Sequence, residues 1–159
     1  MSRVKSERSS RSPLISAPID TAVSSVLTID TSGEGFVDFS DDVRSFVTDS
    51  GVRSGSVLLF VRHTSASLTI QENADPDVLT DLVTALHRLA PRDGGWVHDA
   101  EGPDDMPAHI RTMLTATSLQ IPVSDGAPVL GTWQGVYLIE HRARPHRREI
   151  VMQAIGSRG

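Results

Sequence analysis

Apolar residues recur with two different periods along this chain, and each period predicts a different kind of element. Between residues 19 and 30 ("IDTAVSSVLTID"), β-branched residues occupy nearly every second position, which predicts a strand. The segment 55–64 ("GSVLLFVRHT") is almost continuously apolar, as buried strands are, and the alternating segment 65–71 continues this strand or pairs with it. Further strands are predicted at 118–123, 128–131, 135–141 and 148–155.

Two segments have the three- and four-residue spacing of amphipathic helices. In the first, Ser40 is expected to be the N-cap, and the helix ends near Gly51. The second covers residues 73–91, with Asp75 as its expected cap and Pro76 at the first helical position. The faces that these two helices are expected to bury consist of Val43, Phe46, Val47, Val78, Leu82, Leu86 and Leu89.

A third helix is predicted at about residues 105–116, with Asp104 or Asp105 as its cap. The resulting order of strand, helix, strands, two helices and strands lacks regular βαβ alternation. It therefore predicts an α+β fold: a single compact domain with a largely antiparallel, β-sandwich-like sheet core and helices on one side. The Ser- and Arg-rich residues 1–17 lack an apolar stripe and are expected to form a disordered tail, which leaves 18–159 as the domain.

Composition narrows the chemistry that this domain can perform. The 159 residues include no cysteine, so a metal would have to be held by His, Asp or Glu. The net charge of -5 argues against nucleic-acid binding, and no apolar run reaches the length of a membrane span, so neither partner is expected. Without a secretory signal pattern, the expected location is the cytoplasm.

The segment 101–110 ("EGPDDMPAHI") combines three carboxylates, two prolines and a histidine. Pro103 and Pro107 restrict the backbone, so the segment is expected to be stiff. His98 precedes His109 by eleven positions, and a loop that folds back could bring both imidazoles to one ion. Alternatively, the carboxylates cap a helix and the histidines make ordinary hydrogen bonds. Spacing alone leaves both interpretations open.

Two more segments could contribute to a pocket. His63, Thr64 and Ser65 follow a predicted buried strand, which would hold them rigidly, although their spacing favours an ordinary β-turn. Near the C-terminus an arginine cluster suits phosphate, or else forms a solvated strand end. Its members are Arg142, Arg144, Arg147 and Arg148.

Taken together, "HTSASLTIQENADPDVLTDL", "EGPDDMPAHI" and "GTWQGVYLIEHR" resemble the YjbQ-like family, which is labelled secondary thiamine-phosphate synthase. The resemblance covers about residues 20–156. It implies a homotrimer with a histidine-lined pocket near the subunit contacts, where Trp133 is expected to lie. It also implies an enzyme that joins a pyrimidine diphosphate to a thiazole phosphate and releases diphosphate. The alternative is a non-catalytic trimeric protein that binds a metal or a phosphorylated metabolite.

The resemblance also assigns roles to individual residues. The motif histidines His63, His98 and His109 are expected to hold a divalent ion, either zinc or magnesium, with Asp99, Asp104 or Asp105 accepting from a ligand imidazole. The expected catalytic residues are His63, His109, Glu140 and Arg147. The expected residues for binding the small phosphorylated substrate are Thr64, Ser65, Asn73, Thr132, Gln134 and Arg148. Gln71 departs from the family, which commonly has asparagine at this position.

Overall fold

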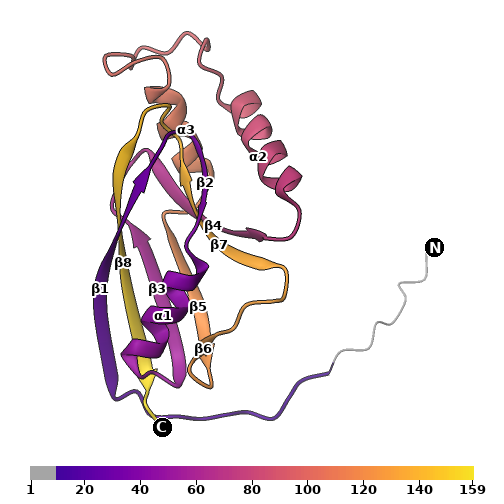
Figure 1. Cartoon of the computed structure of the whole chain (residues 1–159), viewed down its shortest axis with the longest axis vertical. Helices are drawn as coiled ribbons and strands as arrows, with labels where there is room; N and C mark the ends of the chain where they lie inside the picture. The colour runs from indigo at the N-terminus through magenta and orange to yellow at the C-terminus, as the bar shows by residue number, and fades with distance from the viewer. Residues whose placement is uncertain (1–9) are drawn as a thin grey trace, which may run out of the picture.

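Eight strands form two antiparallel sheets in the computed structural model, which describes residues 10–159 (Figure 1). The first sheet has the strand order β1 (Thr21–Thr31), β8 (His146–Ser157), β3 (Ser54–Val61), β5 (Ser118–Ser124) and β6 (Ala127–Pro128). The second sheet has the order β2 (Gly35–Asp38), β7 (Gln134–Glu140) and β4 (Ala66–Glu72). Every strand pair is antiparallel, which confirms the predicted α+β fold with an antiparallel core.

The hydrophobic core is built by side chains from both sheets and from the first helix, α1 (Ser40–Ser50). Fully buried members from these elements are Val43, Val47, Leu59, Leu68, Leu138 and Ile150. Burying an aliphatic side chain of this size stabilises the fold by about 1.5–3 kcal/mol. One continuous core of this kind makes the described residues a single domain, as predicted.

The ends of α1 differ from the prediction at one terminus only. The helix ends at Gly51, whose φ of 71° is left-handed, as expected for a glycine C-cap. The N-cap is Phe39, because Ser40 already lies within the helix. The Ser40 hydroxyl donates to Asp38 (2.5 Å) and accepts from the Val136 N–H (2.8 Å), so it connects α1 to β7 instead of capping the helix.

The second helix, α2 (Pro76–Leu89), forms as predicted but does not bury its apolar stripe. Asp75 caps it by accepting from the Asp77 N–H at 2.9 Å, with Pro76 at the first position. Residues 10–159 bury none of its side chains fully, and Leu89 is 65% exposed. Figure 1 shows why: α2 stands beside the sheets instead of across them. Amphipathicity predicts which face needs cover, but not what covers it.

The segment 65–71 does not extend β3 or pair with it, contrary to the prediction. It forms β4, whose backbone pairs with β7, while β3 pairs with β5 and β8. The turn between β3 and β4 therefore carries the chain from one sheet to the other. Since residues 62–65 form this turn, they lie at the junction of the two sheets.

The third helix, α3 (Asp105–Leu114), packs on β4 and follows a long loop above both sheets in Figure 1. At the other end of the chain, residues 10–20 belong to no helix or strand and are exposed, whereas residues 1–9 of the predicted tail lie outside the described part. Within residues 10–159, no helix is long and apolar enough to cross a membrane.

Candidate functional site

The first turn of α3 and the loop before it bring two histidines and a carboxylate together. One potential ligand atom from each of His98, Asp105 and His109 lies within 4.8 Å of the others. The His98 Nε2 atom is 2.9 Å from one carboxylate oxygen of Asp105, and the His109 Nε2 atom is 3.5 Å from the other. Asp105 and His109 are four residues apart on the helix, so they share a face.

A backbone contact decides which nitrogen of His109 is free. Its Nδ1 atom lies 3.0 Å from the carbonyl oxygen of Thr64. A carbonyl can only accept, so Nδ1 carries the proton and the lone pair of the neutral ring is on Nε2, which faces Asp105. Histidines that bind metals are oriented in this way by a partner on the second nitrogen. If His109 binds an ion, its outer hydrogen-bond partner would be the Thr64 carbonyl and not an aspartate as expected.

Arg142 holds the acidic residues Glu101, Asp104 and Asp105 in place. Its guanidinium donates to Asp105 (2.6 Å) and Asp104 (3.1 Å), and it also contacts Glu101 (3.3 Å). Burial opposes ionisation of Asp104, but hydrogen bonds from Ala143 N–H and Arg142 outweigh it and lower the pKa of this carboxyl. Three carboxylates therefore surround one guanidinium, and the site keeps an excess of negative charge.

The two aspartates do not cap α3 as predicted. Asp104 occupies the N-cap position, but its side chain makes no capping hydrogen bond. Its carboxylate accepts from the backbone N–H of Ala143 at 2.8 Å instead. Arg142 and Ala143 are distant in sequence, so local capping rules could not reveal this competition.

The three converging residues fit a divalent cation. Two imidazole nitrogens and one carboxylate oxygen are a donor set typical of zinc, whereas magnesium prefers oxygen ligands. Tetrahedral zinc ligands are about 3.4 Å apart, given bonds of about 2.1 Å. The observed spacing of up to 4.8 Å requires only side-chain rotation. His98 is 56% exposed and can rotate, while Asp105, 3% exposed, is fixed and His109 is oriented by the Thr64 carbonyl.

His63 lies beside this group but is not one of its members. Its Nε2 atom accepts from the backbone N–H of Glu149 at 2.9 Å, so Nδ1 carries the proton in the neutral ring. Burial and the neighbouring Arg148 lower the pKa of His63. His63 lines a hollow of about 600 Å³ together with Phe60, Val61, Arg62, Thr64, Ser65 and Thr117. Since Thr64 also contacts His109, the hollow adjoins the histidine–aspartate group.

Glu140 and Arg148, two further predicted site residues, lie in the interior beneath this hollow. Glu140 is fully buried and accepts from Arg148 (2.5 Å), the Arg142 N–H (2.9 Å) and Thr31 (2.8 Å). Burial opposes its ionisation, but these hydrogen bonds outweigh that effect and lower its pKa. Arg148 also donates to the Ser65 hydroxyl at 3.1 Å and so supports the hollow.

The remaining predicted site residues lie elsewhere. Arg147 is exposed and pairs with Asp30 at 2.8 Å. Gln134 pairs with Glu72 at one end of β4 and β7, whereas Glu140 pairs with Ala66 at the other. Six residues of strand separate these ends by about 20 Å, at roughly 3.3 Å per residue. Thr132 is exposed and precedes Gln134, so the structure does not bring these residues to the histidine–aspartate group.

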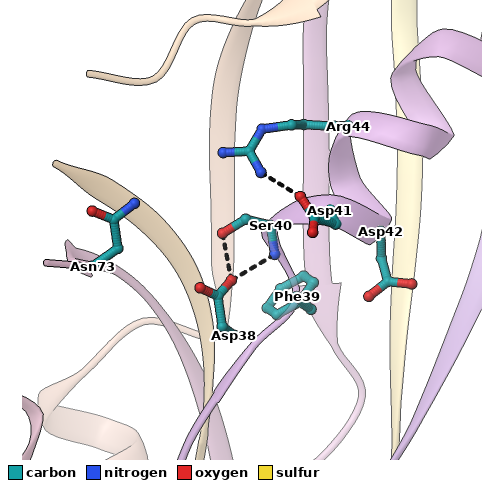
Figure 2. Close-up of a pocket in the computed structure, with 7 residues that line it drawn as sticks. All are labelled: Asp38, Phe39, Ser40, Asp41, Asp42, Arg44 and Asn73. Atoms are coloured by element: carbon teal, nitrogen blue, oxygen red, sulfur yellow. Dashed lines mark hydrogen bonds and ion pairs between the residues drawn. The ribbon is translucent and has the colours of Figure 1, made fainter. Parts of the chain in front are cut away.

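Asn73 lies at that distant end too and lines a different hollow, of about 510 Å³ (Figure 2). There Asp38 accepts from the backbone and hydroxyl of Ser40, and Arg44 contacts Asp41 at 2.7 Å. Asp38 and Asp41 thus bind partners within their own helix terminus, and among residues 10–159 the ligand atoms at this hollow do not converge as those of His98, Asp105 and His109 do.

Comparison with known proteins identifies the family to which this chain belongs. The family model described as "UPF0047 protein YjbQ-like" matches residues 25–157. A UPF0047 protein of Synechocystis sp. is 54% identical over 132 residues, which are 82% of this chain and 90% of that relative. The YjbQ protein of Escherichia coli O157:H7 is 41% identical over 126 residues, covering 79% of this chain and 91% of the relative.

Solved structures agree with the sequence relatives. A yjbq/upf0047 family protein from Clostridium acetobutylicum superposes with a TM-score of 0.76 at 37% identity, covering 81% of this chain and 98% of that one. A protein of unknown function from Sulfolobus solfataricus gives a TM-score of 0.77 at 25% identity, covering 86% and 99% of the two chains. The chain described here therefore belongs to the YjbQ-like family of UPF0047 proteins.

Proposed function

We propose that this protein binds a divalent ion, best zinc, through His98, Asp105 and His109, and acts on a small phosphorylated substrate in the hollow beside it. One observation carries the proposal: the Thr64 carbonyl fixes the His109 tautomer that leaves Nε2 free, and Thr64 itself lines the hollow. A cation and a substrate would thus be held by neighbouring groups. The excess negative charge around Arg142 favours a cation at this position.

The reaction is thiamine phosphate synthesis, and the hollow offers groups suited to it. The bond between the pyrimidine methylene carbon and diphosphate breaks, diphosphate leaves with the electron pair, and the thiazole nitrogen forms the new bond to that carbon. A bound ion supplies positive charge that stabilises the departing diphosphate. Around the substrate, Nδ1–H of His63 and the hydroxyls of Thr64 and Ser65 are available as donors to phosphate oxygens.

The wall of the hollow contributes in another way. Phe60 and Val61 form its apolar side, which would shield a cationic pyrimidine intermediate from water. Arg62 contributes positive charge, although it also contacts Glu149 at 3.5 Å. Arg148 acts indirectly, because its guanidinium is bound to Glu140 and Ser65 and holds the turn that carries the donors.

The active assembly is a homotrimer in this proposal, with further copies covering the outer face of the five-stranded sheet. That face carries the exposed apolar side chains Val26, Leu58 and Phe60. Contiguous apolar surface of this kind is typical of a protein interface. Because Phe60 also lines the hollow, a neighbouring copy would close the pocket. Light scattering that reports a monomer at micromolar concentration would overturn this part.

The test combines metal binding with turnover. Zinc affinity is measured on metal-stripped protein, and thiamine phosphate formation is measured with and without added zinc. His109→Ala should abolish both. His146→Ala serves as the matched control because, among residues 10–159, the only hydrogen-bond partner of its imidazole is the Arg144 carbonyl at 2.8 Å. Loss of an outer partner of a metal ligand alone reduces affinity or activity roughly 10- to 100-fold, so the loss of a ligand should exceed that range. Zinc binding without turnover would instead support a non-catalytic protein that binds a metal or a phosphorylated metabolite.

A further inference from the structure

We propose that Glu34 is a positioning residue that holds both histidine-bearing segments of the metal site in place, an inference that rests on the proposed function. Glu34 lies in the turn between β1 and β2 and touches none of the three proposed ligands. Its carboxylate instead contacts His87 (2.8 Å), Arg92 (3.0 Å) and Arg111. These partners belong to α2, the long loop and α3.

Arg111 carries the effect of Glu34 to His109. The two residues lie two positions apart on α3, and the Arg111 side chain is only 1% exposed. Besides Glu34, its guanidinium donates to the carbonyl of Ala90 at 3.0 Å. A buried guanidinium with a fixed carboxylate partner restrains the helix that carries it. The rotation of α3, and with it the direction of Asp105 and His109, is therefore set by this contact.

The loop that carries His98 is restrained by the same carboxylate. The loop begins after Ala90, whose carbonyl Arg111 holds, and Arg92 contacts Glu34 two residues later. From there the chain reaches His98 and then returns to Asp105 at the start of α3. Glu34 thus secures the beginning of the loop and, through Arg111, the helix at its end. His98 is the most exposed of the three ligands, so it depends most on this restraint.

The backbone around Glu34 is built to aim its carboxylate. Gly33 and Gly35 flank it with φ values of 138° and 148°, which favour glycine. A Cβ on Gly33 would lie 2.8 Å from the carbonyl oxygen of Ala143, the residue whose N–H binds Asp104. The turn is therefore packed against the acidic segment as well as pointing at the arginines.

Charge explains why a neutral replacement should loosen the site. One carboxylate faces the guanidinium groups of Arg92 and Arg111 together with the His87 imidazole. Replacing it with an amide keeps the shape but leaves two guanidinium groups close together without a counter-charge, and like charges repel. Arg92, about half exposed, would move away first and take the start of the His98 loop with it.

The test uses the full-length protein with zinc and cobalt as probes. Glu34→Gln should weaken zinc binding about tenfold, since outer partners of metal ligands contribute factors of roughly 10–100 to affinity. The visible absorption of the cobalt-loaded protein should change as well, because it reports ligand geometry. Asp30→Asn is the matched control: it removes the charge from a carboxylate that pairs with an exposed arginine, on the strand that precedes the Glu34 turn.

A second pair of variants guards against a folding defect in Glu34→Gln. Arg92→Gln should also weaken zinc binding, and Arg92→Lys should restore it, because lysine can still reach the carboxylate. If wild type binds zinc and the Glu34 and Arg92 variants bind it equally well, the positioning role is wrong while the metal site stands. If wild type binds neither ion, the proposed function fails, and this inference with it.

Discussion

Two buried arginine–carboxylate pairs, Glu140–Arg148 and Asp105–Arg142, lie at the short connection between β7 and β8. They differ in whether the carboxylate keeps an oxygen that could bind a ligand. Glu140 accepts from Arg148, Thr31 and a backbone N–H, so both its oxygens are occupied inside the protein. Asp105 gives one oxygen to Arg142 and turns the other toward His98. Both are buried, yet only Asp105 has an oxygen facing partners that could bind a ligand.

This difference distinguishes Glu140–Arg148, a structural ion pair, from Asp105–Arg142, which belongs to the candidate metal site. The family resemblance suggested Glu140 as a catalytic residue. In the structure its hydrogen bonds hold β1, β7 and β8 together. A buried pair whose carboxylate oxygens are all hydrogen-bonded within the protein supports the fold. A pair with one oxygen directed at exposed imidazoles could bind a cation.

The largest effect is expected when the Glu140–Arg148 pair is broken. Arg148→Ala should lower the free energy of unfolding by about 3–5 kcal/mol, because it leaves Glu140 charged and buried without its partner. Urea denaturation measures this loss. The double variant Glu140→Leu/Arg148→Met removes both charges and should recover most of the stability. A loss below about 1 kcal/mol for Arg148→Ala would show that the pair is not structural.

His141, between the two pairs in sequence, should make stability depend on pH. Burial and the nearby Arg111 lower its pKa from 6.5 to about 4. The unfolded chain therefore binds the extra proton, and stability falls as pH decreases from about 6.5 to 4, by roughly 3 kcal/mol in total. His63 adds in the same direction.

The pH effect can be isolated with one substitution. Glu140 and Asp104 have lowered pKa values, so their contribution is lost only below the values of 4.5 and 3.8 from which they are shifted. His141→Gln should flatten the unfolding free energy between pH 6.5 and 4.5. If urea denaturation gives the variant the same pH slope as wild type, His141 is not the group responsible.

Beside the Asp105–Arg142 pair, the expected change is in zinc affinity and not in the stability of the fold. His98→Ala should reduce zinc affinity by more than roughly 100-fold, because loss of an outer partner alone reduces it 10- to 100-fold. The side chain is 56% exposed, so the free energy of unfolding without metal should change by less than about 1 kcal/mol. Calorimetric titration and urea denaturation check the two halves. Unchanged affinity would remove His98 from the site.

The smallest effect is expected at Arg147, which the family resemblance suggested as catalytic. Its guanidinium is exposed and pairs only with the exposed Asp30 among residues 10–159. Arg147→Ala should leave both the unfolding midpoint and the zinc affinity unchanged. If thiamine phosphate formation occurs and this variant loses it, the exposed arginine contacts the substrate, and the substrate site extends beyond the residues that line the hollow around His63.

Helix termini that depend on a few adjacent residues were predictable from sequence, and contacts between distant segments were not. The Asp75 cap and the Gly51 terminus were predicted because each depends on a few adjacent residues. Asp105 was identified only as a cap or an outer partner, since its competing partner Arg142 lies 37 residues away. An aspartate and a histidine four positions apart on a predicted helix were the available signal for the site.

The same reasoning explains the uncertain role of His63 and the absence of Glu34 from the sequence-based candidates. The family resemblance grouped His63 with His98 and His109, but its ring nitrogen accepts from the backbone N–H of Glu149, 86 positions away. Glu34 stood in a glycine-flanked turn with no neighbouring motif. Its partners come from three segments that only the folded chain assembles. The coarse fold depended on periodicity and was therefore accessible from sequence.

The position of β8 has a consequence for how the protein is made. Among the elements of residues 10–159, this strand is synthesised last, yet it lies between β1, the first of them, and β3. While the ribosome still holds residues 146–157, β1 has no hydrogen-bonding neighbour in its sheet, and the larger sheet cannot close. The larger sheet can therefore form only after residues 146–157 have left the ribosome, and nascent chains stalled before that point would expose unpaired strand edges that chaperones recognise.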